Sequence, residues 1–119
     1  MAGIGGNIVG TVFAKKSSGR NSIGESITEW IEAATQIGWL GLQTGDSDRS
    51  NFNTKIEKST HVFLCDYNPI IYALADQDIR MMIKSRMYDV LMIDNPDEMD
   101  EQLEIYLKYV GGQENVSNV

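Results

Sequence analysis

Apolar residues recur at every second position between Asp78 and Val110, and this alternation is the strongest structural signal in the chain. The segment divides into three runs, DIRMMIK, RMYDVLMIDN and EQLEIYLKYV. A period of two places alternate side chains on one face of a sheet. The apolar positions of these faces are Ile79, Met81 and Ile83, then Tyr88, Val90 and Met92, then Leu103, Ile105 and Leu107. The pattern predicts a three-stranded antiparallel meander.

The links between the three runs are short and polar. The first two runs are joined around Lys84-Ser85-Arg86, and the last two by the acidic turn Asn95-Pro96-Asp97-Glu98. Short links of this kind connect neighbouring antiparallel strands.

Two further strands are predicted upstream. Asn7–Lys15 alternates and forms the first, and the turn-rich segment Ser17–Glu25 is expected to be a hairpin loop. Glu29–Gln43 is expected to be one long bent strand or two short ones, with Trp30 and Trp39 as packing anchors. A short helix over ITEWIEAATQ is the alternative, although β-branched residues and two glycines disfavour it.

The segment Lys58–Tyr67 predicts a strand with apolar groups on both faces. Such a strand is covered on both sides, by the barrel interior and by another element or subunit. Asn68-Pro69 then has the form of a helix start, with Asn as N-cap and Pro at the first helical position. A short helix or an irregular apolar loop follows over 69–75.

These elements define the expected fold. The chain is predicted to be all-β, a small β-barrel or sandwich-like barrel with a C-terminal three-stranded antiparallel meander, a long polar loop and, as one of the two alternatives over 69–75, one short helix. We expect a single β-barrel domain over 1–110, with the loop 44–57 projecting, and a flexible C-terminal tail over 111–119.

Composition narrows the class of protein. The longest apolar run, Ile70–Ala75, is far shorter than the roughly 20 residues that span a bilayer, and the N-terminus lacks the basic region of a secretory signal. Cys65 is the single cysteine, which excludes an internal disulfide and fits a reducing compartment. We therefore expect no membrane association and synthesis in the cytoplasm.

The net charge of −7 is distributed unevenly. Residues 1–60 hold six Lys/Arg and six Asp/Glu, whereas residues 61–119 hold four and eleven. Proteins that grip nucleic acid neutralise its phosphates with basic side chains. Conventional DNA or RNA binding is therefore disfavoured, while a surface that DNA passes without sticking remains compatible with this charge.

The sequence contains no complete set of residues for a catalytic, metal or phosphate site. His61 and Cys65 would share a strand face but lie about 13 Å apart at about 3.3 Å per residue, whereas a nucleophile and its base need hydrogen-bond reach. The acidic run Asp94–Glu101 lacks the glycine and spacing of a calcium loop, and the N-terminal GIGG does not follow a strand, as a phosphate loop must. One His and one Cys exclude a zinc site. We expect no catalytic residue, no metal and no cofactor.

The order of elements resembles the head–tail joining family of tailed phages and prophages, also called head-completion, head-closure or stopper proteins. The resemblance covers roughly residues 24–110. It is carried by Gly24-Glu25, Trp30 and Ala34-Thr35; by Thr60-His61 and Tyr67; and by Asp78-Ile79-Arg80, Arg86, Tyr88, Val90, Ile93-Asp94-Asn95 and Leu103-Glu104-Ile105. The chain departs from the family at Met82-Ile83-Lys84-Ser85, where a tyrosine-glycine hairpin is common, and in the apolar segment Pro69–Ala75.

The resemblance implies a structural virion protein at the head–tail interface, assembled in the host cytoplasm. Its partners would be copies of itself in a homo-oligomeric ring, an adaptor or portal ring above, and a tail or tail-terminator protein below. The ring would close the DNA channel, and double-stranded DNA would pass without specific binding. The expected channel or gating loop comprises Thr44, Gly45, Asp46, Ser47, Asp48, Arg49, Ser50, Asn51, Phe52, Asn53, Thr54 and Lys55. The expected subunit or partner interface comprises Pro69, Ile70, Ile71, Tyr72 and Leu74.

A second hypothesis is a free-standing β-barrel adaptor module that docks another protein through its apolar strand and its tail. A hydrolase or nuclease is disfavoured because the sequence contains no evident general base, nucleophile or metal cluster. A disordered surface excursion is the alternative interpretation of residues 44–55.

Overall fold

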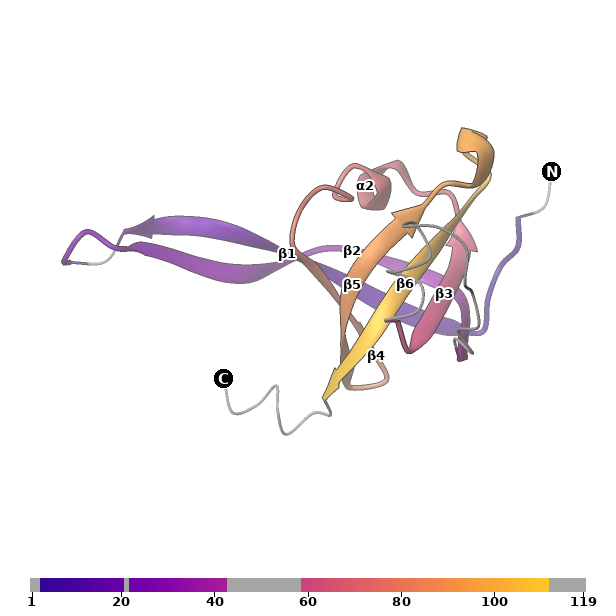
Figure 1. Ribbon diagram of the computed structural model, residues 1–119, viewed down its shortest axis with the longest axis horizontal. Coiled ribbons are helices and arrows are strands. Elements are labelled where there is room, and N and C mark those ends of the chain that lie inside the picture. Colours follow the sequence, from indigo (N-terminus) through magenta and orange to yellow (C-terminus); the bar gives the residue numbers. More distant parts are fainter. Residues whose placement is uncertain (1–2, 21, 43–58, 112–119) are drawn as a thin grey trace.

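The chain folds around a closed β-barrel in a computed structural model that describes residues 3–20, 22–42 and 59–111 (Figure 1). Among these residues, six antiparallel strands close in the order β1-β2-β3-β6-β5-β4. The strands are β1 (Ile8–Arg20), β2 (Ser26–Leu42), β3 (His61–Asp66), β4 (Ile79–Ile83), β5 (Arg86–Asp94) and β6 (Gln102–Gly111). The all-β barrel and its C-terminal meander β4-β5-β6 are therefore confirmed.

Side chains fill the barrel interior. The alternation predicted for the meander places Ile79, Met81 and Ile83 of β4 inside, and Leu103, Ile105 and Leu107 of β6 meet them there. The remaining buried apolar side chains of the core are Val12, Ala14, Phe63, Cys65, Ile71, Tyr88 and Ile93. A small barrel packed in this way has its lumen occupied by its own residues, so its contacts with other molecules are made on the outside.

Strand β5 departs from strict alternation. Val90 pairs with Leu107 and Met92 with Tyr106, so Leu91 is an extra residue in the ladder. A bulge of this kind reverses the faces of the residues that follow it. Ile93 is therefore buried in the core and Met92 is not, and the prediction that Met92 shares the core face with Tyr88 and Val90 is wrong.

The links of the meander are tight. The β4–β5 hairpin closes through Lys84 and Ser85, both with positive φ (51° and 64°), between the paired residues Ile83 and Arg86. Two central residues with positive φ characterise the type I′ turn, whose twist matches that of the flanking strands. Between β5 and β6 the chain makes a single 3-10 turn, η1 (Pro96–Glu98).

A short helix, α2 (Pro69–Tyr72), covers one end of the barrel, as the Asn-Pro pair indicates. The Asn68 side chain accepts hydrogen bonds from the backbone N–H groups of Ile70 (2.9 Å) and Ile71 (3.4 Å), which have no partner within the helix. Asn68 also donates to the Gln36 side-chain oxygen (3.0 Å). These bonds tie the helix to β2. No helix in the described part of the chain is long and apolar enough to cross a bilayer.

The first hairpin is much longer than the sequence indicates. Strand β1 continues to Arg20 and β2 begins at Ser26, so the segment Ser17–Glu25 is strand in its first part and turns only in its second, and the prediction of a loop over the whole segment is wrong in its extent. Strand β2 is one continuous strand, so of the two predictions for this segment, one long strand or two short ones, the first is confirmed. Figure 1 shows the hairpin extending from the barrel along the longest axis of the molecule, whose principal extents are 49 × 34 × 27 Å.

Candidate interaction site at the base of the arm

The projecting part of the first hairpin comprises residues 15–30, and we refer to it as the arm. Strand β4 pairs with β1 only over Gly10–Ala14, and β3 pairs with β2 only over Gly38–Leu42. Within the described residues, the two strands of the arm therefore form a ladder only with each other. Near the tip, Gly19 and Gly24 have positive φ (123° and 91°), which glycine adopts without a steric penalty. The Arg20 guanidinium donates to the Gly24 carbonyl oxygen (2.7 Å) and helps to close the turn.

Two cations lie near one tryptophan where the arm leaves the barrel. Trp30 is paired with Lys15 across the β1–β2 ladder, and the Lys15 ammonium is 5.9 Å from its ring centroid. The Arg80 guanidinium, on β4, lies 4.7 Å from the same centroid. Cations at these distances over an indole face are attracted to the ring, by about 0.5–1 kcal/mol at exposed sites. The root of the arm is thereby held against β4.

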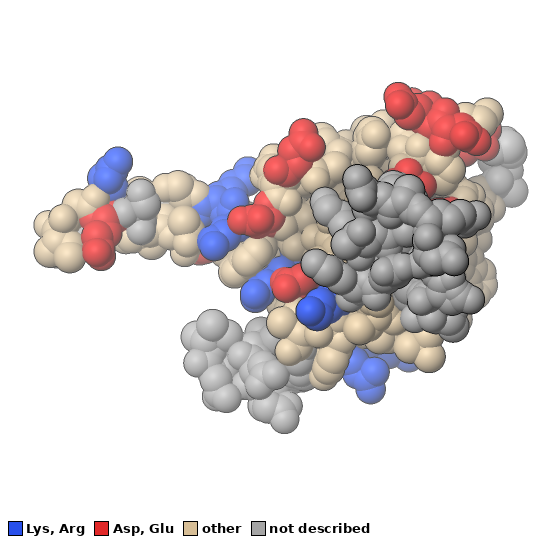
Figure 2. All heavy atoms as spheres, viewed as in Figure 1, with Lys and Arg blue, Asp and Glu red and all other residues tan. Residues whose placement is uncertain are grey.

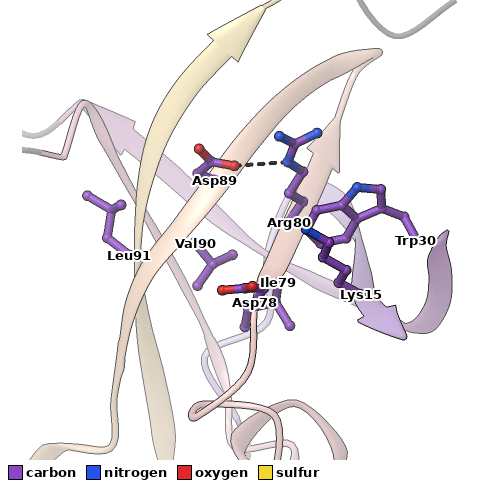
Figure 3. A pocket seen from close by; sticks show the side chains of 8 residues that line it. All are labelled: Lys15, Trp30, Asp78, Ile79, Arg80, Asp89, Val90 and Leu91. Carbon is purple, nitrogen blue, oxygen red and sulfur yellow. Dashed lines mark hydrogen bonds and ion pairs between the residues drawn. The ribbon is translucent and has the colours of Figure 1, made fainter. Parts of the chain in front are cut away.

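An ion pair orients the arginine of this cluster. Arg80 Nε donates to Asp89 Oδ1 at 2.9 Å, and the two residues are directly opposite each other in the β4–β5 ladder. Both side chains are partly exposed, at 35% and 43%. A pair of this exposure contributes little stability. Figure 3 shows the Arg80 side chain lying between Asp89 and Trp30, so the ion pair helps to hold the guanidinium beside the indole.

Two hollows flank the Trp30–Arg80 contact. The larger, about 330 Å³, is lined by Lys15, Trp30, Asp78, Ile79, Arg80, Asp89, Val90 and Leu91 (Figure 3). The smaller, about 180 Å³, is lined by Phe13, Trp30, Arg80, Met82 and Met87. Trp30 and Arg80 belong to both. Aromatic residues, Met and Arg are the side chains enriched in protein–protein interfaces, so the smaller hollow has the composition of a docking site, whereas the larger one also carries charged side chains of Lys15, Asp78 and Asp89.

Metal chemistry has no evident centre in the part of the chain described. No group of three or more His, Cys, Asp or Glu side chains gathers there in a way that could hold a metal ion.

The His61 and Cys65 side chains have separate surroundings. The His61 ring packs edge-on against Tyr88, with centroids 5.1 Å apart, and its Nδ1 lies 2.9 Å from the Thr60 hydroxyl. Burial, assisted by the Arg86 charge, lowers the pKa of His61 below its usual value, so the ring is neutral at pH 7. Cys65 is fully buried, and burial together with the nearby Asp66 charge raises the pKa of its thiol to about 12. A protonated, buried thiol is a poor nucleophile.

We expect Cys65 to resist alkylation in the native chain. At pH 8 the thiol is protonated and covered, so iodoacetamide should modify it slowly, and urea should make it react at the rate of a free thiol. Mass spectrometry of timed samples measures both rates. Because the pKa is raised above the unfolded value of 9.0, the associated stability is fully present below pH 9 and is lost as the pH rises toward about 12. Equal labelling rates with and without urea would contradict the buried position of Cys65.

The interface predicted around 69–75 divides between core and surface. Ile71 is fully buried and belongs to the barrel core, and Tyr72 and Leu74 pack partly against it. Pro69 is exposed, and Ile70 is 59% exposed. The segment therefore serves first to close the barrel end, and only its outward side chains are available to a partner.

The predicted channel loop Thr44–Lys55 lies outside the described residues, as does the tail beyond Gly111. The strand predicted to be covered on both faces is β3. Its inner residues Phe63 and Cys65 are fully buried, while Val62 and Leu64 on the outer face are partly exposed.

The tryptophans are not core anchors. Trp30 is 37% exposed on the arm and Trp39 is 44% exposed on β2, where its indole N–H donates to the Ile4 carbonyl oxygen (2.8 Å). The sequence predicts that these residues are packing anchors, in the core or at an interface; the structure places neither in the core, and packing at an interface remains a prediction. Sequence reasoning missed the cluster itself because Trp30 and Arg80 are 50 residues apart. The signal in the sequence was Trp30 next to Glu29 and near Glu32, in a strand longer than a small barrel needs.

Comparisons with known proteins add no homologue. Neither a scan against protein-family models nor a search of curated proteins finds a match for this chain.

Proposed function

We propose that this chain is a structural virion protein of a tailed phage or prophage, a head–tail connector of the head-completion or stopper type. Copies of it would form a ring that closes the DNA channel below the portal or adaptor and presents a surface to which the tail or its terminator protein binds. The observation that carries the proposal is a barrel with a filled interior and a long projecting arm. Such an architecture provides contacts on its outside and along its arm.

The outer surface of the barrel, which is available to partners, supports this proposal. Its interior is occupied by the core side chains, and the smaller hollow at the arm is an open surface feature lined by residue types that are enriched in interfaces. A fold by itself does not define a function, so the surface carries this part of the argument. It has a docking cluster at the arm root and apolar side chains exposed on neighbouring strands, including Val9, Ile37 and Trp39.

Residues that carry the family resemblance meet in space. Trp30 and Arg80, from two separate parts of the resemblance, stack on each other at the arm root. Side chains brought into contact by the fold are more specific support than isolated matches in sequence.

The charge distribution supports a passage for DNA. Figure 2 shows acidic side chains gathered at the end of the barrel that carries η1, where Asp97, Glu98, Asp100 and Glu101 are exposed. Carboxylates repel the phosphate backbone, and an acidic lining would allow a packaged genome to slide. In this proposal the loop Thr44–Lys55 contributes to closing the channel.

A free-standing protein-binding adaptor is the second candidate. The Trp30–Arg80 cluster favours it, because a docking surface of this composition can bind a partner without a ring.

Removal of the gene from its phage or prophage tests the proposal. We expect electron microscopy to show heads and free tails that fail to join, with packaged DNA leaking from the heads, and wild-type protein supplied in trans should restore joined particles. Mass spectrometry of purified virions should detect the chain in several copies per particle. Normal tailed particles without the gene would overturn the connector proposal. The adaptor would then be tested by identifying what the arm root binds, with Arg80→Gln as the comparison variant.

A further inference from the structure

The two strands of the first hairpin carry opposite charge. Strand β1 contains Lys15, Lys16 and Arg20 and no acidic residue between Ile8 and Arg20. Strand β2 contains Glu29 and Glu32 and no basic residue between Ser26 and Leu42. The hairpin is therefore a ribbon with a basic strand and an acidic strand.

Each strand of this ribbon has an open side. The ladder partner of β1 beyond Lys15 and of β2 before Gly38 is only the other strand of the hairpin, among the residues described. Figure 1 shows the arm standing clear of the other labelled strands. Edges of this length present backbone N–H and C=O groups that can pair with a further strand. A two-stranded ribbon is only marginally stable in water, and additional strands stabilise it.

We infer that the arms of neighbouring copies of this chain pair edge to edge, with the acidic β2 edge of one copy against the basic β1 edge of the next. Strand β2 runs from the tip toward the barrel and β1 runs from the barrel toward the tip. Two arms that point the same way therefore bring β2 and β1 together antiparallel, which repeats the pairing already present within each hairpin. The inference rests on the proposed function for the closure of the ring.

Charge selects this arrangement over its alternatives. Pairing two β2 edges would place Glu29 and Glu32 near their own copies, and pairing two β1 edges would gather lysines and arginines. Like charges across a ladder are destabilising, and opposite charges are stabilising. The favoured contact joins two different surfaces of the chain, and such a head-to-tail contact generates a ring when its rotation closes. It also covers part of Trp30 and Ile31, which are 37% and 42% exposed.

Charge reversal at one ladder position tests the inference. Lys16 and Glu29 are directly opposite each other within the hairpin. Lys16→Glu gives a chain whose arm is acidic at both positions, and Glu29→Lys gives one that is basic at both. Sedimentation velocity at low salt measures the self-association of each protein, and circular dichroism verifies that the barrel is folded.

We expect the wild-type chain to associate and each single variant to associate about tenfold more weakly. An equimolar mixture of the two variants should recover association. The mismatch inside each hairpin persists in the mixture, so recovery can arise only between chains. The double variant, with both charges exchanged, is the matched control and should associate alone. A wild-type chain that stays monomeric at low salt, or a mixture no better than its components, would overturn the inference.

A second measurement does not depend on charge. A tagged Ser17→Cys chain mixed with an untagged Thr28→Cys chain should form the mixed disulfide in preference to either homodimer, because these residues lie on opposite edges of the ribbon. Random pairing of the three products would count against edge-to-edge contact. Arm pairing in a protein whose gene is dispensable for particle assembly would overturn the connector proposal alone. Particles that assemble equally well with Lys16→Glu would overturn arm pairing alone.

Discussion

Replacing Gly38 by alanine is expected to destabilise the barrel by about 3 kcal/mol, at the upper end of the usual cost of overpacking. A Cβ atom at this position would lie 2.5 Å from the Leu64 carbonyl oxygen and 2.7 Å from Cζ of Phe63. Phe63 is fully buried, so its ring cannot move away without disturbing the core. The backbone carbonyl is equally fixed, because β2 and β3 pair at this point.

Gly41→Ala provides the matched control. Gly41 lies on the same strand, and a Cβ atom there would meet no heavy atom of the described residues within 4 Å. The free energy of unfolding from urea titrations should change by no more than about 0.5 kcal/mol, as for an ordinary surface substitution. Similar losses for both variants would mean that the close approach of β2 and β3 does not determine the cost at Gly38.

Truncation of Ile71 to alanine is expected to cost about 3 kcal/mol, within the range for deleting buried aliphatic side chains. Ile71 is fully buried and is the side chain by which α2 enters the core. The cavity left behind would loosen the helix from the barrel end.

Its neighbour Ile70 supplies the comparison. Ile70 belongs to the same helix but is 59% exposed, so Ile70→Ala should change the free energy of unfolding by no more than about 0.5 kcal/mol. Urea titration of both variants separates the structural role of this segment from any binding role. An equal loss in both variants would mean that the helix is held by something other than Ile71.

The meander was predictable because its information is local. Alternation in β4 and β6 specifies one buried face without reference to the rest of the chain, and Asn68-Pro69 specifies a helix start through its own hydrogen bonds. Ile79, Met81, Leu103 and Ile105 accordingly occupy the core that the pattern predicts. These features would be recognisable in almost any context.

The misplaced residues have non-local causes. The bulge at Leu91 is visible only in the register of β5 against β6, and nothing in the local sequence marks it. The turn-rich composition of Ser17–Glu25 indicated a loop, yet pairing with the opposite strand extends β1 through Arg20. Tertiary pairing overrode local turn preference there.

The candidate site could be anticipated only in part. Trp30 was recognisable as a packing residue, but its partner Arg80 is supplied by β4, which the barrel closure brings beside β1. The opposite charges of the arm strands are visible in the sequence, but they have meaning only once the hairpin is known to project. The channel role predicted for Thr44–Lys55 stays a prediction, since it falls outside the described residues.

Because the arm is attached to the described part of the barrel only at its base, a small tilt at the base produces a larger displacement at the tip. At about 3.3 Å per residue, the stretch Lys15–Arg20 reaches roughly 17–20 Å from its base, so a tilt of about 10° at the root displaces the tip by about 3 Å. The contact at the base is that of Trp30 with Arg80, and the Lys15 ammonium also lies near the Trp30 ring. These side chains help to set the direction of the ribbon together with the continuous β1–β2 ladder, so we expect a substitution at the root to shift a tip that it does not contact.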